Sequence, residues 1–271
     1  MRLAIFSDIH GNPLALEAVL SDIQSQGEAD RYWVLGDFAA IGYDPVTPLE
    51  KLTALPHASF TRGNTDRYVV TEDLPVPPVQ ALHNPALLPE VIETVRSFSW
   101  TRGYLSAAGW LDWFTNIPLE LRLTLPDGTR LLGVHASPDR DDGPGLQPGQ
   151  SESELERQLA GCGADVVIVG HSHIPLDRQI GSMRAINLGS VSNPITPGLQ
   201  ATYVLLDADE QGYRIQLRRV DYDREAVIKA IEHSRHPTSS YLIGFMRGER
   251  ILSSDPGFFQ AGRRAQNQKE Q

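Results

Sequence analysis

Short apolar runs alternate in the first part of the chain with segments whose apolar positions recur at helical spacing. Residues 2–6 predict a buried strand, and residues 13–26 predict an amphipathic helix that begins at a proline. The order recurs further on, with strands predicted at 32–35 and 58–61 and a helix at 45–54. Polar residues follow each of the three strands, and parallel strands would bring them together at one edge of a sheet.

Residues 71–118 interrupt this rhythm. They begin with a proline-rich stretch and continue with helical patterns at 89–98 and 106–114, so we expect a helical cap inserted into the fold. Strand patterns resume at 119–125 and 130–134, and the Pro-Asp-Gly sequence between them predicts a hairpin. A hairpin beside parallel strands makes the expected sheet mixed.

The second half of the chain carries further strand and helix patterns and ends in a polar segment. The expected elements are two helices, a strand and a hairpin, at 152–160, 224–233, 166–169 and 201–220. Together these patterns predict an α/β fold. We expect one domain over residues 1–251, with the cap inserted at about 71–118 and a polar C-terminal tail at 252–271.

Composition narrows the class of protein. Of the 271 residues, 41% are hydrophobic and 21% charged, as in folded globular proteins. The net charge of -10, without a dense Lys/Arg run, argues against extended binding to nucleic acid. No apolar run is long enough to span a bilayer and the first residues lack a basic leader, so we expect a cytoplasmic protein without a membrane anchor. Cys162, the single cysteine, excludes thiolate clusters, so His, Asp or Asn must hold any metal.

Residues that bind metals in proteins follow five of the apolar runs. Each segment alone has an ordinary explanation: Asp-x-His forms caps, Gly-Asp and Gly-Asn form turns, and His135 by itself is typical of a hydrogen-bonded core histidine. Their joint position decides the interpretation, because four of the eight histidines fall just beyond predicted strands, together with two aspartates and an asparagine. These candidate ligands are Asp8, His10, Asp37, Asn64, His135, His171 and His173.

The order and chemistry of these segments resemble the calcineurin-like metallophosphoesterase superfamily, over residues 3–191. Within it, residues 100–118 and 187–191 are similar to a bacterial and archaeal branch named diadenosine-tetraphosphatase-like or protein-phosphatase-like. The resemblance implies a central mixed β-sandwich flanked by helices. It also implies that Asp8, His10 and His173 bind one metal ion, that Asn64, His135 and His171 bind another, and that Asp37 bridges the two.

Two divalent ions in such a site explain the expected chemistry. Ions about 3.5 to 4 Å apart repel each other, and a carboxylate such as Asp37 both screens and ligates them. Water shared by the two ions becomes a hydroxide near neutral pH and attacks phosphorus. Imidazole with carboxylate suits manganese or iron, and also zinc or nickel, better than calcium.

Three residues are candidates for substrate binding. Arg62 occupies the position of a phosphate-binding arginine in the related protein phosphatases, and its alternative is a surface ion pair. Asn64 is expected to take part in catalysis beside Asp37 and Arg62 and also to contact the substrate. Asn12 has a donor for phosphate, and its alternative is a helix cap. Asp66 is expected to orient Arg62 or a histidine.

One departure from the family pattern bears on the mechanism. Many members carry a histidine after the Gly-Asn pair, where it protonates the leaving group, but this chain has Thr65. The Thr65 hydroxyl is too weak an acid to replace it. His83, in the expected cap, is the candidate substitute, and its alternative is an exposed loop histidine. His57, His233 and His236 are expected to be structural or surface residues.

The sequence favours a metal-dependent phosphoesterase that hydrolyses phosphodiesters such as cyclic nucleotides, dinucleotides or aryl esters. A phosphomonoesterase acting on nucleotides or phosphoproteins is the first alternative. A different class, a scaffold or metal sensor of the same fold without turnover, is the second. The expected partner is a small phosphorylated molecule of nucleotide type.

Overall fold

A computed structural model of the chain describes residues 1–249. Its first sheet has five strands in the order β10-β9-β1-β2-β3, and β1, β2 and β3 run parallel while β9 and β10 add to it antiparallel. The strands are β1 (Arg2–Phe6), β2 (Arg31–Leu35), β3 (Ala58–Thr61), β9 (Ala201–Asp209) and β10 (Gly212–Val220). The predicted parallel run and the predicted hairpin at 201–220 are thus confirmed.

The second sheet also has five strands, in the order β4-β5-β6-β8-β7. The pairs β5–β6 and β6–β8 are parallel, and β4 and β7 lie antiparallel at the two edges. The strands are β4 (Glu120–Thr124), β5 (Arg130–Val134), β6 (Val166–Val169), β7 (Leu176–Ile180) and β8 (Met183–Asn187). The predicted hairpin of β4 and β5 is present, so both sheets are mixed.

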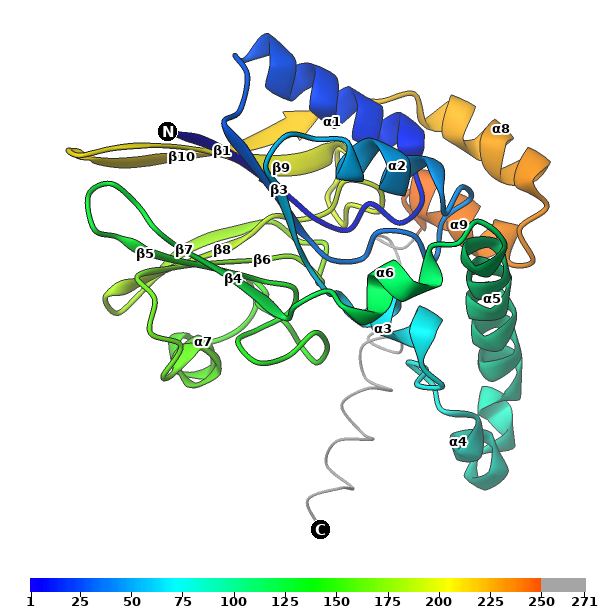
Figure 1. The fold of residues 1–271 in the computed structure, drawn as a ribbon. Coiled ribbons are helices and arrows are strands. Elements are labelled where there is room, and N and C mark those ends of the chain that lie inside the picture. The colour runs from blue at the N-terminus through cyan, green and yellow to red at the C-terminus, as the bar shows by residue number, and fades with distance from the viewer. Residues whose placement is uncertain (250–271) are drawn as a thin grey trace.

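The two sheets pack face to face as a sandwich (Figure 1). Side chains alternate along β1: Leu3 and Ile5 belong to the core between the sheets, whereas Ala4 and Phe6 face the helices. Leu131 and Ile168 meet the first pair from the opposite sheet. The expected α/β fold with a central mixed β-sandwich flanked by helices is confirmed.

Helices cover both outer faces of the sandwich. The helices α1 (Pro13–Ser25) and α2 (Thr47–Thr53) lie over the first sheet, and α7 (Glu152–Leu159) lies over the second (Figure 1). Two further helices, α8 (Arg224–Ser234) and α9 (Ser239–Met246), pack against each other through a small apolar cluster. None of the described helices is long and apolar enough to cross a membrane.

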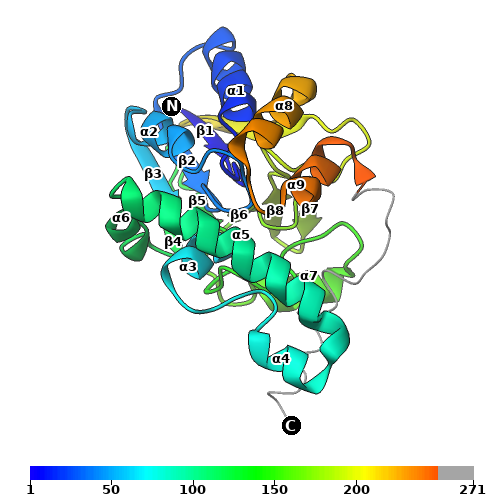
Figure 2. The ribbon, with the colours of Figure 1, turned by 90° about the vertical axis from the view of Figure 1, so that its right-hand side faces the viewer.

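The segment 71–118 is helical, as predicted, but its helices differ from the predicted ones. It contains α4 (Pro78–His83), a 3₁₀ turn (Pro85–Leu87), α5 (Leu88–Ala107) and α6 (Leu111–Thr115). The helix α5 continues past the predicted end at residue 98 to Ala107. The helix expected at 106–114 is divided between the end of α5 and α6 by a break at Gly109, whose φ is +77°. Figure 2 shows α5 crossing the side that carries the carboxyl ends of β1 and β2.

Outside the segment 71–118, four elements were not predicted. They are β7, β8, α9 and the short helix α3 (Asn64–Val70), which begins directly after β3 and packs against α5. The division into one domain over 1–251 stays a prediction, and the tail expected at 252–271 lies outside the described residues.

Candidate metal centre

The structure brings all seven candidate ligands to the same edge of the sandwich. Each follows the carboxyl end of a parallel strand, as expected for ligand sites in α/β sheets. Three come from the first sheet's β1 and β2, one from the start of α3 after β3, and three from the second sheet's β5 and β6. In the order of the strands they are Asp8, His10, Asp37, Asn64, His135, His171 and His173.

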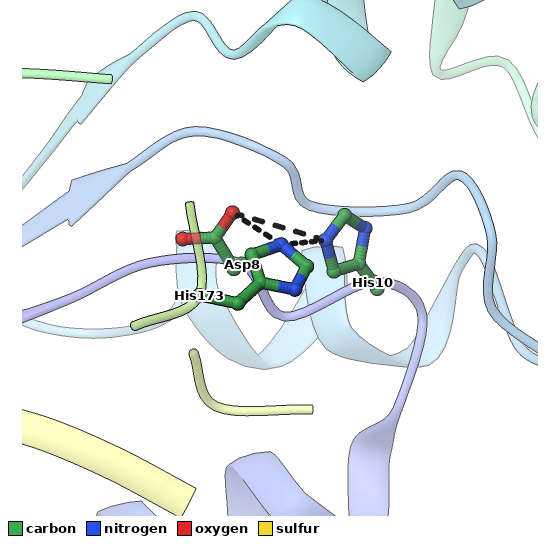
Figure 3. Close-up of side chains that lie close together, drawn as sticks. All are labelled: Asp8, His10 and His173. Atoms are coloured by element: carbon green, nitrogen blue, oxygen red, sulfur yellow. Dashed lines mark hydrogen bonds and ion pairs between the residues drawn. The ribbon is translucent and has the colours of Figure 1, made fainter. Parts of the chain in front are cut away.

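Asp8, His10 and His173 form the first group (Figure 3). The Nε2 atoms of His10 and His173 lie 3.2 Å apart. The Oδ1 atom of Asp8 lies 3.2 Å from Nε2 of His173 and 3.8 Å from Nε2 of His10. All three side chains are buried, so solvent screens their charges weakly.

Hydrogen bonds on the far side of each ring fix the tautomers of both histidines. Nδ1 of His10 lies 2.9 Å from the carbonyl oxygen of Ala40, and Nδ1 of His173 lies 2.9 Å from that of Asn193. A carbonyl oxygen only accepts, so each Nδ1 carries the hydrogen and each Nε2 of the neutral ring presents a lone pair. Asp8 Oδ1, facing them, has no hydrogen-bond partner. Three buried acceptors therefore converge without a donor, an arrangement that fits a cation.

Asn64, His135 and His171 form the second group. Asn64 Oδ1 lies 2.9 Å from Nδ1 of His171 and 3.1 Å from Nε2 of His135. The opposite ring nitrogens donate to backbone carbonyls: His135 Nδ1 to Leu35 at 2.6 Å and His171 Nε2 to Gly143 at 2.8 Å. The two rings therefore turn their other nitrogens toward the same amide oxygen.

Asp37 lies between the two groups. Its Oδ2 atom is 3.8 Å from Nε2 of His10 and 3.4 Å from Nε2 of His135, while its Oδ1 accepts the backbone N–H of Thr65 at 3.0 Å. Asp8, Asp37 and His135 also bring one ligand atom each to within 4.8 Å of one another. Asp37 therefore lies within 4 Å of one histidine of each group, and its bridging role stays a prediction.

The charges of the centre shift the ionisation of its residues. Burial lowers the pKa of His10 to about 4. Burial also disfavours the charged form of His135, but the Asp37 carboxylate outweighs it and raises the pKa of His135 to about 10. Burial opposes ionisation of Asp8 and Asp37 as well, yet the histidines beside them lower the pKa of both carboxyls. Without metal, the centre therefore holds a proton on His135 next to Asp37.

The backbone of the ligand loops is strained. A non-glycine residue rarely adopts positive φ, and such residues cluster at functional sites because each costs about 1–3 kcal/mol. Positive φ values of 45–68° occur at five of the seven candidate ligands, namely Asp8, His10, Asp37, His171 and His173. The surrounding structure holds these residues in a conformation that their sequence does not favour.

Two glycines let the ligand loops approach each other. A Cβ atom added at Gly63 would overlap Oδ1 of Asp37, and one added at Gly170 would overlap Oδ2 of Asp8. Gly63 and Gly170 therefore precede Asn64 and His171 for a steric reason, since any side chain there would displace a carboxylate.

Asp66 supports the centre in a way that the sequence did not predict. It was expected to orient Arg62 or a histidine, but its carboxylate instead accepts three backbone N–H groups, from Asp37, Phe38 and Gly63, at 2.7–3.0 Å. Burial and the charge of Asp37 raise the pKa of Asp66 to about 7. Asp66 thus ties the loop after β2 to the start of α3.

The candidate substrate-binding residues have other partners in this structure. The Arg62 guanidinium, 29% exposed, bonds Asp141 through Nε and Nη2, both at 2.8 Å. Asn12 is buried, and its Oδ1 caps α1 by accepting the N–H of Ala15 while its Nδ2 donates to Ser192. Asn12 therefore serves as the helix cap that was its alternative role, and Arg62 forms an ion pair while it stays partly exposed.

The remaining histidines separate into exposed and buried ones. His83 lies exposed at the end of α4, and His57 and His233 are exposed as well. His236 is buried, with its ring 4.6 Å from that of Trp100 on α5, and burial lowers its pKa to about 4. Thr65 is buried, and its hydroxyl has no hydrogen-bond partner.

The comparison with known families gives the class of protein to which this fold belongs. The family model described as the calcineurin-like phosphoesterase superfamily domain matches residues 1–211, so the chain belongs to that superfamily. The finer branch expected from residues 100–118 and 187–191 stays a prediction.

Among individual proteins, the uncharacterized protein MJ0912 of Methanocaldococcus jannaschii is 26% identical over 256 residues, which cover 87% of this chain and 93% of the relative. The crystal structure of the hypothetical protein PH1004 from Pyrococcus horikoshii has a TM-score of 0.75 at 20% identity, covering 90% of this chain and 97% of the other. A metallophosphoesterase from Sphaerobacter thermophilus has a TM-score of 0.70 at 24% identity, covering 92% and 99%. These structures share the fold.

Proposed function

We propose that this chain is a phosphoesterase that binds two divalent metal ions and hydrolyses phosphodiesters. The observation that carries the proposal is the convergence of Asp8 Oδ1 with the bare Nε2 atoms of His10 and His173, three buried acceptors with no donor among them. Such a cluster is unfavourable until a cation neutralises it. Membership of a phosphoesterase superfamily supports the reaction class.

The proposed ligand sets follow the two groups. Asp8, His10 and His173 would hold one ion, Asn64, His135 and His171 the other, and Asp37 would contact both. We propose manganese or iron, with zinc or nickel as alternatives, because imidazole and carboxylate ligands suit these metals. When bound, two such ions activate water as a nucleophile and neutralise charge on the phosphoryl oxygens.

The residues of the chain position the substrate around that centre. Arg62 is proposed to bind the substrate phosphate at the rim, and its forked donors suit two phosphate oxygens. In this structure Asp141 occupies the same donors, so phosphate has to compete with a carboxylate that is only 6% exposed. Asn64 stands beside Arg62 in sequence and is proposed to contact the substrate through its amide nitrogen.

The presence of threonine at position 65 favours phosphodiesters with good leaving groups as the substrate class. A residue at this position would protonate the leaving oxygen if it were acidic enough, and a threonine hydroxyl is not. Aryl and cyclic esters depart without such help more readily than alkyl phosphates do. The proposed partner is accordingly a small nucleotide-like phosphodiester, and the proposed location is the cytoplasm.

The test is metal-dependent hydrolysis of bis(p-nitrophenyl) phosphate by protein stripped with chelator and reloaded with Mn²⁺. Asp37→Asn should lose metal and reduce turnover by roughly 10³-fold, because bound metal contributes several kcal/mol to the barrier. Asp177→Asn is the matched control, since Asp177 forms an exposed ion pair with Arg184 on the second sheet. Two bound ions without turnover on mono- or diesters would instead identify a metal sensor, and no bound ion would identify a scaffold.

A further inference from the structure

We propose that Arg67 is a positioning residue that selectively supports the Asn64, His135 and His171 metal site, by clamping helix α3 to the loop between β5 and α7. This inference rests on the proposed function, because it concerns one of the two metal sites proposed above. Arg67 is outside the ligand set and was not singled out from the sequence.

One guanidinium holds three carboxylates. Arg67 Nε lies 3.1 Å from both oxygens of Asp141, Nη2 lies 2.8 Å from Asp142, and Nη1 lies 2.6 Å from Asp73. The Arg67 side chain is only 17% exposed, and the Asp141 side chain 6% exposed, so water screens the Asp141 bond weakly. Arg67 therefore joins α3, the β5–α7 loop (residues 135–151) and the start of the cap.

The loop that Arg67 anchors fixes one metal ligand. Gly143 follows Asp142 directly, and its carbonyl oxygen accepts the Nε2 hydrogen of His171 at 2.8 Å. Two residues further on, Gly145 packs so close to the His171 ring that an added Cβ would lie 3.1 Å from Cδ2. The position and the tautomer of His171 therefore depend on where this loop lies.

The other end of the clamp fixes a second ligand of the same ion. Asn64 opens α3, and Arg67 follows within the first turn of that helix. Holding Arg67 to Asp141 and Asp142 thus sets the separation between Asn64 and His171, which is now 2.9 Å between Oδ1 and Nδ1. The histidines of the other site are held by carbonyls of Ala40 and Asn193, neither of which lies in this loop.

The selectivity follows from this asymmetry. Loss of the clamp should loosen one ion and leave the ion at Asp8, His10 and His173 in place. Partners that orient metal ligands typically contribute 10–100-fold to affinity, so we expect Arg67→Ala to weaken one of two Mn²⁺ sites by roughly 10–100-fold. Arg67→Lys should recover part of the loss, because an ammonium reaches one carboxylate but not three.

The metal-free full chain is titrated with Mn²⁺ by calorimetry. Electron paramagnetic resonance of the Mn²⁺-loaded protein then distinguishes a coupled pair of Mn²⁺ ions from a single ion. Wild type should bind two ions and give the coupled spectrum. Arg67→Ala should bind one ion with unchanged affinity and give the single-ion spectrum at low Mn²⁺. Arg122→Ala, which breaks an exposed ion pair with Glu120, is the control and should match wild type.

Two further variants make the result decisive. Asp73→Asn removes only the bond from Arg67 to the cap, so both metal sites should keep their affinity. Asp142→Asn weakens only the bond from Arg67 to the loop and should lower the affinity of one site. This second variant tests the proposal even if Arg67→Ala does not fold. Folding is checked by circular dichroism. Two unchanged sites in folded Arg67→Ala or Asp142→Asn, or equal weakening of both sites, would overturn the positioning role. Failure of wild type to bind two ions would instead refute the proposed function.

Discussion

Binding of a metal ion beside Asn64 should displace a proton from His135. The Asp37 carboxylate raises the pKa of His135 to about 10, so in the metal-free chain this imidazole is protonated at neutral pH. The Nε2 atom that must ligate the ion is the one that faces Asp37 at 3.4 Å, because Nδ1 donates to Leu35. Metal and proton therefore compete for the same lone pair.

The magnitude follows from this pKa. Below pH 10, each unit of pH changes the protonated-to-neutral ratio of His135 by about tenfold, so the affinity of that site for Mn²⁺ should rise about tenfold per unit. His10 contributes no such dependence near neutral pH, because burial lowers its pKa to about 4. One of the two sites should therefore bind with a release of about one proton from His135.

Calorimetry at about pH 7 and pH 8, in buffers of different ionisation enthalpy, measures both the affinity and the number of protons released. Nitrogen-15 spectra of the metal-free protein report the state of His135 directly, with His135→Gln used to assign its signals. Asp37→Asn should make this imidazole neutral near pH 7, and Asp177→Asn should not. A neutral His135 in metal-free wild type, or two affinities that do not change with pH, would refute the reasoning.

Three other predictions follow from single residues. Arg62→Ala should lower kcat/KM for phosphodiesters by roughly 10–100-fold with two Mn²⁺ ions still bound, and an unchanged value across several substrates would assign Arg62 to the ion pair with Asp141 alone. Because Thr65 supplies no proton, aryl diesters should react roughly 10²–10⁴-fold faster than alkyl ones, as a rate series over leaving groups would show. Unfolded His236 takes up a proton below pH 6.5 but folded His236 only near pH 4, so stability should fall as pH drops through that window. The free energy of unfolding, measured with urea at about pH 7.5 and pH 5, should fall between these pH values, and this fall should be about 2 kcal/mol smaller in His236→Asn.

The sequence predicted the parts of the fold whose hydrophobic pattern is unambiguous. The strands at 2–6, 58–61, 130–134 and 166–169 have the predicted bounds. In β1, β5 and β6 the signal is an apolar run that is buried on both faces, whereas β3 is a partly buried edge strand marked by its place in the alternation of strands and helices. Both β7 and β8 were missed. In β7, a short edge strand, the central residues are polar and partly exposed, and in β8 a buried apolar pair is flanked by Arg184 and Asn187. The break expected within α5 does not occur, because Gly103 is exposed and the buried face continues from Thr101 to Leu105.

The candidate ligands were predictable because each follows a strand end, and strand ends meet in space. Their supports were not. The carbonyls that fix the histidine rings belong to Leu35, Ala40, Gly143 and Asn193, and a backbone carbonyl has no signature in sequence. The bonds from Arg62 and Arg67 to Asp141 span 79 and 74 residues, so no local pattern reveals them.

The two groups of ligands are held by different kinds of structure, and this difference bears on how the centre can be tuned. The carbonyls behind His10 and His173 belong to the connections that follow β2 and β8, and backbone hydrogen bonds tie both connections to the loop after β1. The ring of His171 depends instead on a long loop that is joined to α3 by ion pairs from Arg67 to the buried Asp141 and to the partly exposed Asp142. Loops tolerate substitution better than sheets do, because they carry less of the core. Changes in residues 139–149 should therefore alter one of the two proposed metal sites, and the proposed substrate contact at Arg62, without altering the fold or the other proposed site.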